Sequence, residues 1–266
     1  MSIFPSDWKE DRLKDLCAVN RVSLSASTDP DFEFPYLEIS NVDYFGIVDL
    51  AAIERLRFED APSRARRLVF QNSTIISTVR PNLQAITFFP DDPAGLVCST
   101  GFNVVQPDEN SLCPKFAYYV LISDYGRQYF EAAATGVGYP AVGDKEFGAL
   151  VLPLPTMPEQ KRIATYLDNK CAVLNSMASL HKAANEITRP AGVLNRQMET
   201  LFAYRKSLIH ECVTGQRRVT EADVVRSQLS ENTGHLKLQP SEKNGRLKTA
   251  GGGRPAMLCR STEDLL

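Results

Sequence analysis

A regular apolar repeat in the carboxyl-terminal half constrains this chain more than any other feature. From Tyr166 to Cys212, the positions that alternate by four and three residues are apolar or small, except for Lys170 and Arg205. Such a repeat predicts helix that buries one stripe of side chains against another helix. The large residues that we expect in this contact are Val173, Met177, Leu180, Ile187, Leu194, Met198, Leu201 and Leu208.

The start of this helical segment is marked by capping residues. Thr156 and Glu159 have capping-box spacing, and Pro158 stands in the first turn, where its missing N–H costs nothing. A helix from there to Val213 would hold about 55 residues and span roughly 80 Å. We expect a continuous or kinked rod. The alternative is two ordinary helices of a bundle divided at Pro190, because an interior proline breaks or kinks a helix.

The first 155 residues predict a mixed domain of short strands and helices, so the expected fold class is α+β. Trp8, Leu13 and Leu16 are the expected core anchors near the start. Runs of β-branched and aromatic residues bounded by Asn, Pro, Asp and Gly predict a sheet. These strand-like runs are 36–40, 68–70, 74–79, 85–89, 96–98 and 102–105. Residues 114–134 have helical apolar spacing, and we interpret their aromatic side chains as core rather than as platforms for bases.

Composition excludes several classes of protein. The six cysteines have no paired spacing and only three histidines accompany them, so we expect reduced thiols, no metal site and no disulfide framework. No segment approaches the length of an apolar membrane span, and the first ten residues do not resemble a signal peptide, so we expect a cytoplasmic protein without a membrane partner. The formal net charge of −2 does not by itself indicate nucleic-acid binding.

Motifs of catalysis are missing as well. The sequence has no Gly-rich strand-to-helix loop for a nucleotide or for S-adenosylmethionine, and we expect no cofactor. A Glu-x-Lys triplet of the kind found in nucleases occurs at Glu159–Lys161, but it lies in the first turn of the predicted helix without an acidic partner strand. We therefore expect a protein without catalytic activity.

Several short motifs together resemble the specificity subunits of type I restriction-modification systems. In the helical half these are Leu152–Pro155, Glu159–Ala164, Leu167–Asp168, Tyr204–Ile209 and Val213–Gly215, which resemble the spacer helix of that family. In the first half they are Ile76–Pro81, Cys98–Phe102, Ala134–Gly136 and Tyr139–Pro140, which resemble the target-recognition domain that precedes such a helix. The resemblance covers roughly residues 5 to 220.

The resemblance implies a DNA-binding subunit that guides separate methyltransferase and restriction subunits to a sequence in double-stranded DNA. It also implies a target-recognition domain at 1–155 and a spacer and dimerisation helix at 156–215. The composition of residues 216–266 predicts a flexible tail, with a candidate short helix at Thr220–Leu229. Complete subunits of the family usually carry two such domains and two spacer helices, so this chain corresponds to half a subunit. We expect it to pair with itself as an antiparallel dimer, or with a different half-subunit. The alternative is a degenerate or truncated coiled-coil interaction protein that does not recognise DNA.

Candidate DNA-contacting residues lie where turns meet the ends of predicted strands. Arg80 can bond to guanine or to a phosphate, although an ion pair with Glu38 is its structural alternative. An arginine-rich stretch, 55–67, is a further candidate phosphate contact, or else a surface paired with neighbouring carboxylates. The full set of candidates is Arg80, Asn82, Ser99, Thr100, Gly101, Gly136, Tyr139 and Lys145.

Overall fold

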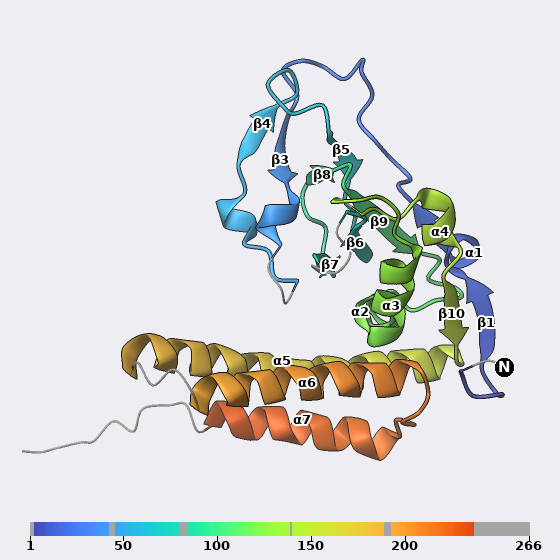
Figure 1. Cartoon of the computed structure of the whole chain (residues 1–266), viewed down its shortest axis with the longest axis vertical. Coiled ribbons are helices and arrows are strands. Elements are labelled where there is room, and N and C mark those ends of the chain that lie inside the picture. Colours follow the sequence, from blue (N-terminus) through green and yellow to red (C-terminus); the bar gives the residue numbers. More distant parts are fainter. Residues whose placement is uncertain (1–2, 43–45, 80–84, 139, 189–192, 237–266) are drawn as a thin grey trace, which may run out of the picture.

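The computed structural model describes residues 3–42, 46–79, 85–138, 140–188 and 193–236, and the side chains of 178–195 and 230–236 lie outside the description. Figure 1 shows two parts, a body of short strands and helices and, beside it, three long helices that run side by side. This arrangement confirms the expected α+β class.

One antiparallel sheet forms the centre of the body. Its strand order is β2 (Cys17–Val19), β9 (Phe102–Pro107), β6 (Ser73–Ser77) and β7 (Ile86–Phe89). Residues of β6 are buried on both faces, which agrees with its continuous run of β-branched and small side chains. The strand-like runs expected at 74–79, 85–89 and 102–105 correspond to β6, β7 and β9 of this sheet, whereas the run at 96–98 belongs to a second sheet.

A second sheet stands next to the first. It contains β4 (Arg55–Arg57), β3 (Glu33–Leu37), β8 (Val97–Ser99) and β5 (Ala65–Leu68) in that order, and β3 and β8 are parallel. The strand expected at 36–40 is thus displaced toward the amino terminus.

The displacement of β3 has a local cause. Glu38 caps a short 3-10 turn, η1 (Ile39–Asn41), in which the side chains of Glu38 and Asn41 each accept a bond from the other's backbone N–H. This capping box ends the strand at Leu37. A second 3-10 turn, η2 (Leu50–Ala52), is capped by the Asp49 side chain, which accepts from the N–H of Ala51.

The start of the chain pairs with the end of the body. β1 (Lys9–Arg12) is antiparallel to β10 (Val151–Leu154), and α1 (Leu13–Leu16) follows β1 directly. Trp8, Leu13 and Leu16 are buried in the main core cluster, which confirms them as anchors.

The aromatic stretch forms two helices, α2 (Pro114–Ile122) and α3 (Asp124–Ala133), where the sequence predicted one. Ser123 lies between them, fully buried, and its hydroxyl accepts a bond from the N–H of Gly126, which caps the second helix. Phe116, Tyr119 and Phe130 are buried, so the prediction that these aromatics form core is confirmed. A short helix, α4 (Asp144–Gly148), precedes β10.

The long helical segment is a hairpin and not a rod. α5 (Met157–Thr188) begins directly after Thr156, as predicted, but α6 (Val193–Val213) lies beside it and runs in the opposite direction (Figure 1). The expectation of a continuous rod is corrected in favour of two helices divided near Pro190, which itself lies outside the described residues. The physical reason is that antiparallel packing within one chain covers the apolar stripe that a lone rod would leave in water.

The large apolar residues of the repeat, from Val173 to Leu208, form the seam between the helices, and the hairpin buries them to different degrees. Leu208 is buried; Val173, Met198 and Leu201 are half-buried; and Met177 is exposed. The side chains of Leu180, Ile187 and Leu194 lie outside the description. The seam therefore has a partner inside its own chain at the end of the hairpin nearest the body.

A third helix continues beyond the predicted spacer. α7 (Glu221–Leu236) packs along α5, where the amide of Asn169 donates to the buried hydroxyl of Ser227 at 2.9 Å. The guanidinium of Arg162 also donates from Nε to the carbonyl of Val219 at 2.8 Å. The candidate short helix at Thr220–Leu229 is present and continues to Leu236, so the expectation of a flexible tail is corrected through that residue.

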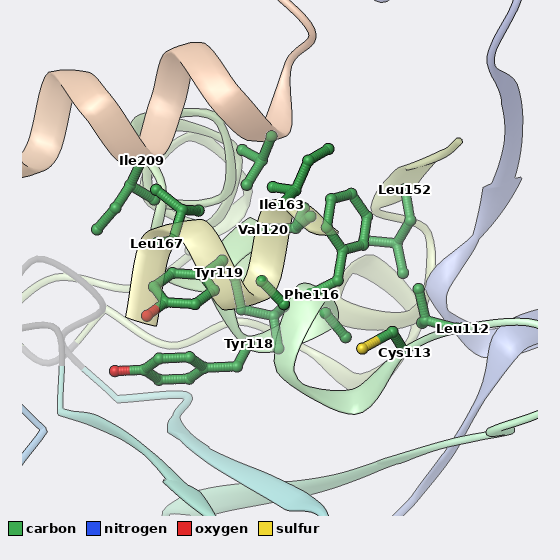
Figure 2. Packing of buried hydrophobic residues seen from close by; sticks show 14 of the residues in the cluster. Leu112, Cys113, Phe116, Tyr118, Tyr119, Val120, Leu152, Ile163, Leu167 and Ile209 are labelled. Atoms are coloured by element: carbon green, nitrogen blue, oxygen red, sulfur yellow. The ribbon is translucent and has the colours of Figure 1, made fainter. Parts of the chain in front are cut away.

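The hairpin is fastened to the body through α2. Figure 2 shows Ile163 and Leu167 of α5 and Ile209 of α6 packed around the buried side chains of α2. Next to this apolar contact, the carboxylate of Asp168 accepts a hydrogen bond from the Tyr119 hydroxyl at 2.7 Å and lies 3.2 Å from the Lys115 ammonium.

The segment after α6 returns to the start of the chain. Gly215 has a positive φ of 75°, and a Cβ there would meet the Pro5 ring at 2.3 Å, so a side chain would not fit. Arg218 lies over the Trp8 ring at 5.2 Å and bonds to Asp7 and Glu159. The Glu159 carboxylate of the Glu-x-Lys triplet is therefore part of a structural ion pair.

Candidate nucleic-acid interface

Three of the segments singled out in the sequence meet at one edge of the sheets. The N–H and the hydroxyl of Thr78, just after β6, donate to the Gly101 carbonyl at 2.9 and 3.1 Å. The Thr78 carbonyl accepts from the N–H of Val142 at 3.0 Å, and Val79 forms a bridge with Ala141. The end of β6, the turn 99–101 and the loop 135–142 thus form one continuous surface.

Three expected members of this surface, Arg80, Asn82 and Tyr139, lie outside the described residues. Arg80 and Asn82 follow Val79 directly in the chain, so they remain candidates by their position alone.

The turn between β8 and β9 is held by its own polar groups. The buried hydroxyl of Ser99 accepts from the N–H of Gly101 at 3.2 Å, and the N–H of Thr100 donates to the Arg64 carbonyl at 2.8 Å. The N–H of Gly101 is therefore not free for DNA, whereas the Ser99 hydroxyl keeps its own O–H and its contact with DNA stays a prediction. The side chain of Thr100 is exposed.

The loop after α3 presents a side chain that the sequence analysis missed. Thr135 and Ala141 exchange two backbone hydrogen bonds of 2.9 Å, which close the base of the loop. Gly136 and Gly138 have φ of 109° and 84°, where glycine is favoured. Val137, between them, is entirely exposed. The two flanking glycines were the available signal for a presented residue; Tyr139 lies outside the described residues.

Lys145 stands close to the same loop in sequence. It is exposed in α4, which begins two residues after Val142. A contact between Lys145 and DNA stays a prediction from this position.

A hollow of about 550 Å³ opens beside the turn. Arg64 reaches into it from the residue before β5: its Nη2 donates to the Glu38 carboxylate at 2.6 Å and its Nε to the Tyr36 hydroxyl at 3.2 Å. The hydrogen bond to Glu38 is the main reason that the pKa of Arg64 is raised. Glu38 therefore pairs with Arg64, where the sequence suggested Arg80. The hollow is lined by Glu38, Ile39, Ser40, Arg64, Val79, Ser99, Thr100 and Gly101.

The arginine-rich stretch 55–67 divides into separate roles. Arg57 pairs with Asp31 at 2.7 Å and with Glu59, and Arg66 lies over the Phe58 ring at 4.5 Å. Arg67 is half-buried and bonds to the Asn103 amide at 2.8 Å, and its burial lowers its pKa. The paired-surface interpretation therefore fits Arg57 better than a shared phosphate contact does.

The described part of the chain contains no cluster of three or more metal-binding side chains. The five cysteines described are buried and unpaired, and burial raises the pKa of the Cys17, Cys98 and Cys212 thiols to about 12. Thiols that stay protonated are poor nucleophiles. Among the described helices, none has the length and apolar content to cross a membrane.

Comparison with known families finds one match that covers most of the chain. The family described as "Type I restriction modification DNA specificity domain" matches residues 5–188.

Curated relatives carry similar names. The chain is 27% identical over 175 residues to the type I restriction enzyme HindI specificity subunit of Haemophilus influenzae, a match that covers 62% of this chain and 36% of that protein. It is 22% identical over 216 residues to the putative type I restriction enzyme MjaX specificity subunit of Methanocaldococcus jannaschii, covering 79% and 46%. The chain therefore spans less than half the length of these relatives.

Solved structures agree with the sequence matches. The HsdS subunit from Thermoanaerobacter tengcongensis superposes with a TM-score of 0.59 at 28% identity. A chain from a study of complex assembly and conformational transition of the type I R-M system gives a TM-score of 0.62 at 29% identity. Each alignment covers 70% of this chain and 47% of the other.

Proposed function

The chain belongs to the family of type I restriction-modification DNA specificity domains, and from this premise we propose that it binds a defined sequence in double-stranded DNA for such a system. The observation that carries the proposal is the surface formed by the end of β6, the turn 99–101 and the loop 135–142. Its loops are hydrogen-bonded to the sheets at their bases, so their tips are held in place.

The chemistry of this surface suits base contacts. Thr100 has an exposed hydroxyl, Val137 offers an apolar group of the kind that contacts the thymine methyl, and Lys145 supplies charge for the backbone. Arg80, Asn82 and Tyr139 adjoin the same segments in sequence and belong to the proposed interface. The domain division at residues 155 and 215 is part of the proposal, with α7 added to the helical unit.

We further propose that catalysis belongs to other subunits. The relatives are named specificity subunits, and one structural neighbour comes from a study of type I complex assembly. The partners are then a methyltransferase subunit and a restriction subunit, while this chain supplies recognition without cofactor or metal.

The proposed assembly is a pair of half-subunits. The chain covers 47% of two solved chains, so a second copy would supply a second recognition body. Since α6 of the same chain already packs against α5, we propose that pairing exchanges α6 between copies, so that each α5 keeps the same antiparallel contacts with the partner's α6. Pairing with a different half-subunit is the competing possibility.

Selection from a randomised duplex pool tests the function. The purified chain, alone and with its methyltransferase subunit, is expected to enrich one motif, and Val137→Asp should weaken binding to that motif by roughly tenfold by placing a charge against DNA. Val225→Asp, an exposed change on α7, is the control and should bind like the original chain. If neither arm enriches a motif, DNA recognition is wrong and an interaction protein without it becomes the better description.

A further inference from the structure

We propose that Glu38 and Arg64 together read one guanine–cytosine base pair through the major groove. The inference rests on the proposed function and deepens it, because it assigns a specificity-determining pair that the sequence did not indicate. The two side chains lie in the hollow beside the turn 99–101, at the edge where the candidate DNA segments meet.

Arg64 is held in one orientation. Its Nη2 bonds to Glu38 at 2.6 Å and its Nε to the Tyr36 hydroxyl at 3.2 Å, and both contacts lie on the same side of the guanidinium. Its backbone is fixed as well, because its carbonyl accepts from Thr100. A guanidinium carries five N–H donors in one plane, so this bonding leaves the Nη1 group and the second Nη2 hydrogen for a ligand.

Glu38 is oriented by a second set of contacts. Its carboxylate accepts from the backbone N–H of Asn41 in the capping box and from Arg64. A carboxylate has about four acceptor positions, so it can still accept a hydrogen bond. The Glu38 side chain is 36% exposed and the Arg64 side chain 58%, so a bound molecule can reach both.

The neighbouring negative charge favours a base over a phosphate. An arginine that binds a phosphate acts chiefly through its charge, and a carboxylate at 2.6 Å offsets that charge and repels a phosphate. The hydrogen-bond donors of Arg64 remain. They therefore suit a neutral acceptor such as a base edge.

The pattern of donors and acceptors selects the base pair. Guanine presents two adjacent acceptors, O6 and N7, which match the paired N–H donors of arginine. The N4 amino group of cytosine donates a hydrogen bond, which the carboxylate of glutamate can accept. Adenine presents a donor beside its N7, which opposes a second arginine N–H. A fixed arginine next to a fixed glutamate thus complements a guanine–cytosine pair.

Single-atom changes in the DNA test this assignment. On the motif selected by the full chain, each guanine is replaced in turn by 7-deazaguanine, which lacks only the N7 acceptor, and the dissociation constant is measured. One position is expected to lose about five- to tenfold in affinity. Arg64→Met, which keeps much of the length of the side chain but lacks its N–H donors, should bind the unmodified motif more weakly and lose sensitivity to that replacement.

Two control variants separate this role from others. Arg57→Ala removes an arginine that is paired with Asp31 and Glu59, and should keep the 7-deazaguanine effect. Glu38→Gln should keep the 7-deazaguanine effect but lose less affinity than the original chain when the pair is changed to adenine–thymine, since the amide can rotate to donate to thymine O4. Thermal melting of each variant confirms that it is folded.

Three results would show that Glu38 and Arg64 do not recognise a guanine–cytosine pair. The first is a motif in which replacing any guanine by 7-deazaguanine leaves the affinity unchanged. The second is a 7-deazaguanine effect that persists in Arg64→Met. The third is a loss of affinity in Arg64→Met that is equal for every DNA sequence. Failure of the proposed function itself looks different, because then no motif is selected at all.

Discussion

At the residue scale, Gln160 shows how one buried amide can join two parts of a molecule. Its carbonyl oxygen accepts from the N–H of Cys113 at 2.8 Å, at the start of α2. Its amide nitrogen donates to the carbonyls of Pro155 and Ser111 at 3.0 and 3.3 Å. Gln160 therefore satisfies backbone groups on both sides of the junction between the body and the hairpin.

Replacing Gln160 by Ala is expected to lower the free energy of unfolding by about 2 kcal/mol, since buried backbone groups lose their partners. This corresponds to a fall of several degrees in Tm for a chain of this size. Lys161→Ala, at the exposed neighbouring position, is the control and should change Tm little. A Tm for Gln160→Ala equal to that of the control would show that water replaces the amide at no cost.

Individual contacts of the site lie beyond what sequence patterns can predict. Glu38 and Arg64 are separated by 26 residues and meet only because β3, β5 and β8 share a sheet. Ser99 and Gly101 have the right types for DNA contacts, but the N–H of Gly101 donates to the Ser99 hydroxyl within a tight turn. Residue type sets what a group can bond to, and the tertiary fold decides which partner it has.

At the element scale, the apolar patterns gave the right types of element and missed some pairings. The runs around β6, β7 and β9 are β-branched and buried, so their strand character could be predicted. β1 has the sequence Lys-Glu-Asp-Arg and is wholly exposed, so its pairing with β10 carries no apolar signal. The seam of α5 likewise predicts a helical partner without saying which chain provides it.

α7 gives a prediction that belongs to a single element. Thr220 and Asp223 form a reciprocal cap, since the Asp223 carboxylate accepts from the N–H and hydroxyl of Thr220 while the Thr220 hydroxyl accepts from the N–H of Asp223. Thr220→Ala is expected to destabilise the start of α7 by about 1 kcal/mol. Hydrogen exchange should quicken in the first turn of α7 and stay unchanged in α2.

The same cap makes the start of α7 sensitive to acid. The hydrogen bonds from Thr220 lower the pKa of Asp223 below its ordinary value of 3.8. The pKa of Asp223 is therefore lower in the folded chain than in the unfolded chain. The cap stabilises α7 fully at pH values above the pKa of the unfolded chain, and this stabilisation is lost as the pH falls through the pKa of the folded chain. If the backbone amides in the first turn of α7 exchange hydrogen equally fast in Thr220→Ala and in the original chain at neutral pH, the cap does not stabilise this turn.

At the scale of the whole molecule, the proposed exchange of α6 predicts the mass of the particle. Light scattering at micromolar concentration should give twice the mass of the chain, and a palindromic motif should emerge from DNA selection because a two-fold axis relates the copies. Leu201→Glu, at a half-buried seam position, should lower the Tm, because the contact between α5 and α6 is lost whether α6 comes from the same copy or from the partner, whereas Leu229→Glu, at an exposed position of α7, should not. If the original chain is a monomer at this concentration, the homodimer is wrong and pairing with a different half-subunit is favoured.

The contact between Arg218 and Trp8 has a consequence for how genes of this kind can be rearranged. The exit from α6 and the entrance to β1 are neighbours in space, so a linker of a few residues could join them without disturbing the sheets. A circular permutant that begins at α5 and ends at β10, with α7 replaced by this linker, would retain the packing of the body on the hairpin of α5 and α6. If two copies exchange α6, the end of α6 of one copy lies beside the start of β1 of the other copy. A head-to-tail fusion of two such genes would then encode both recognition bodies in one polypeptide with only a short connection between them.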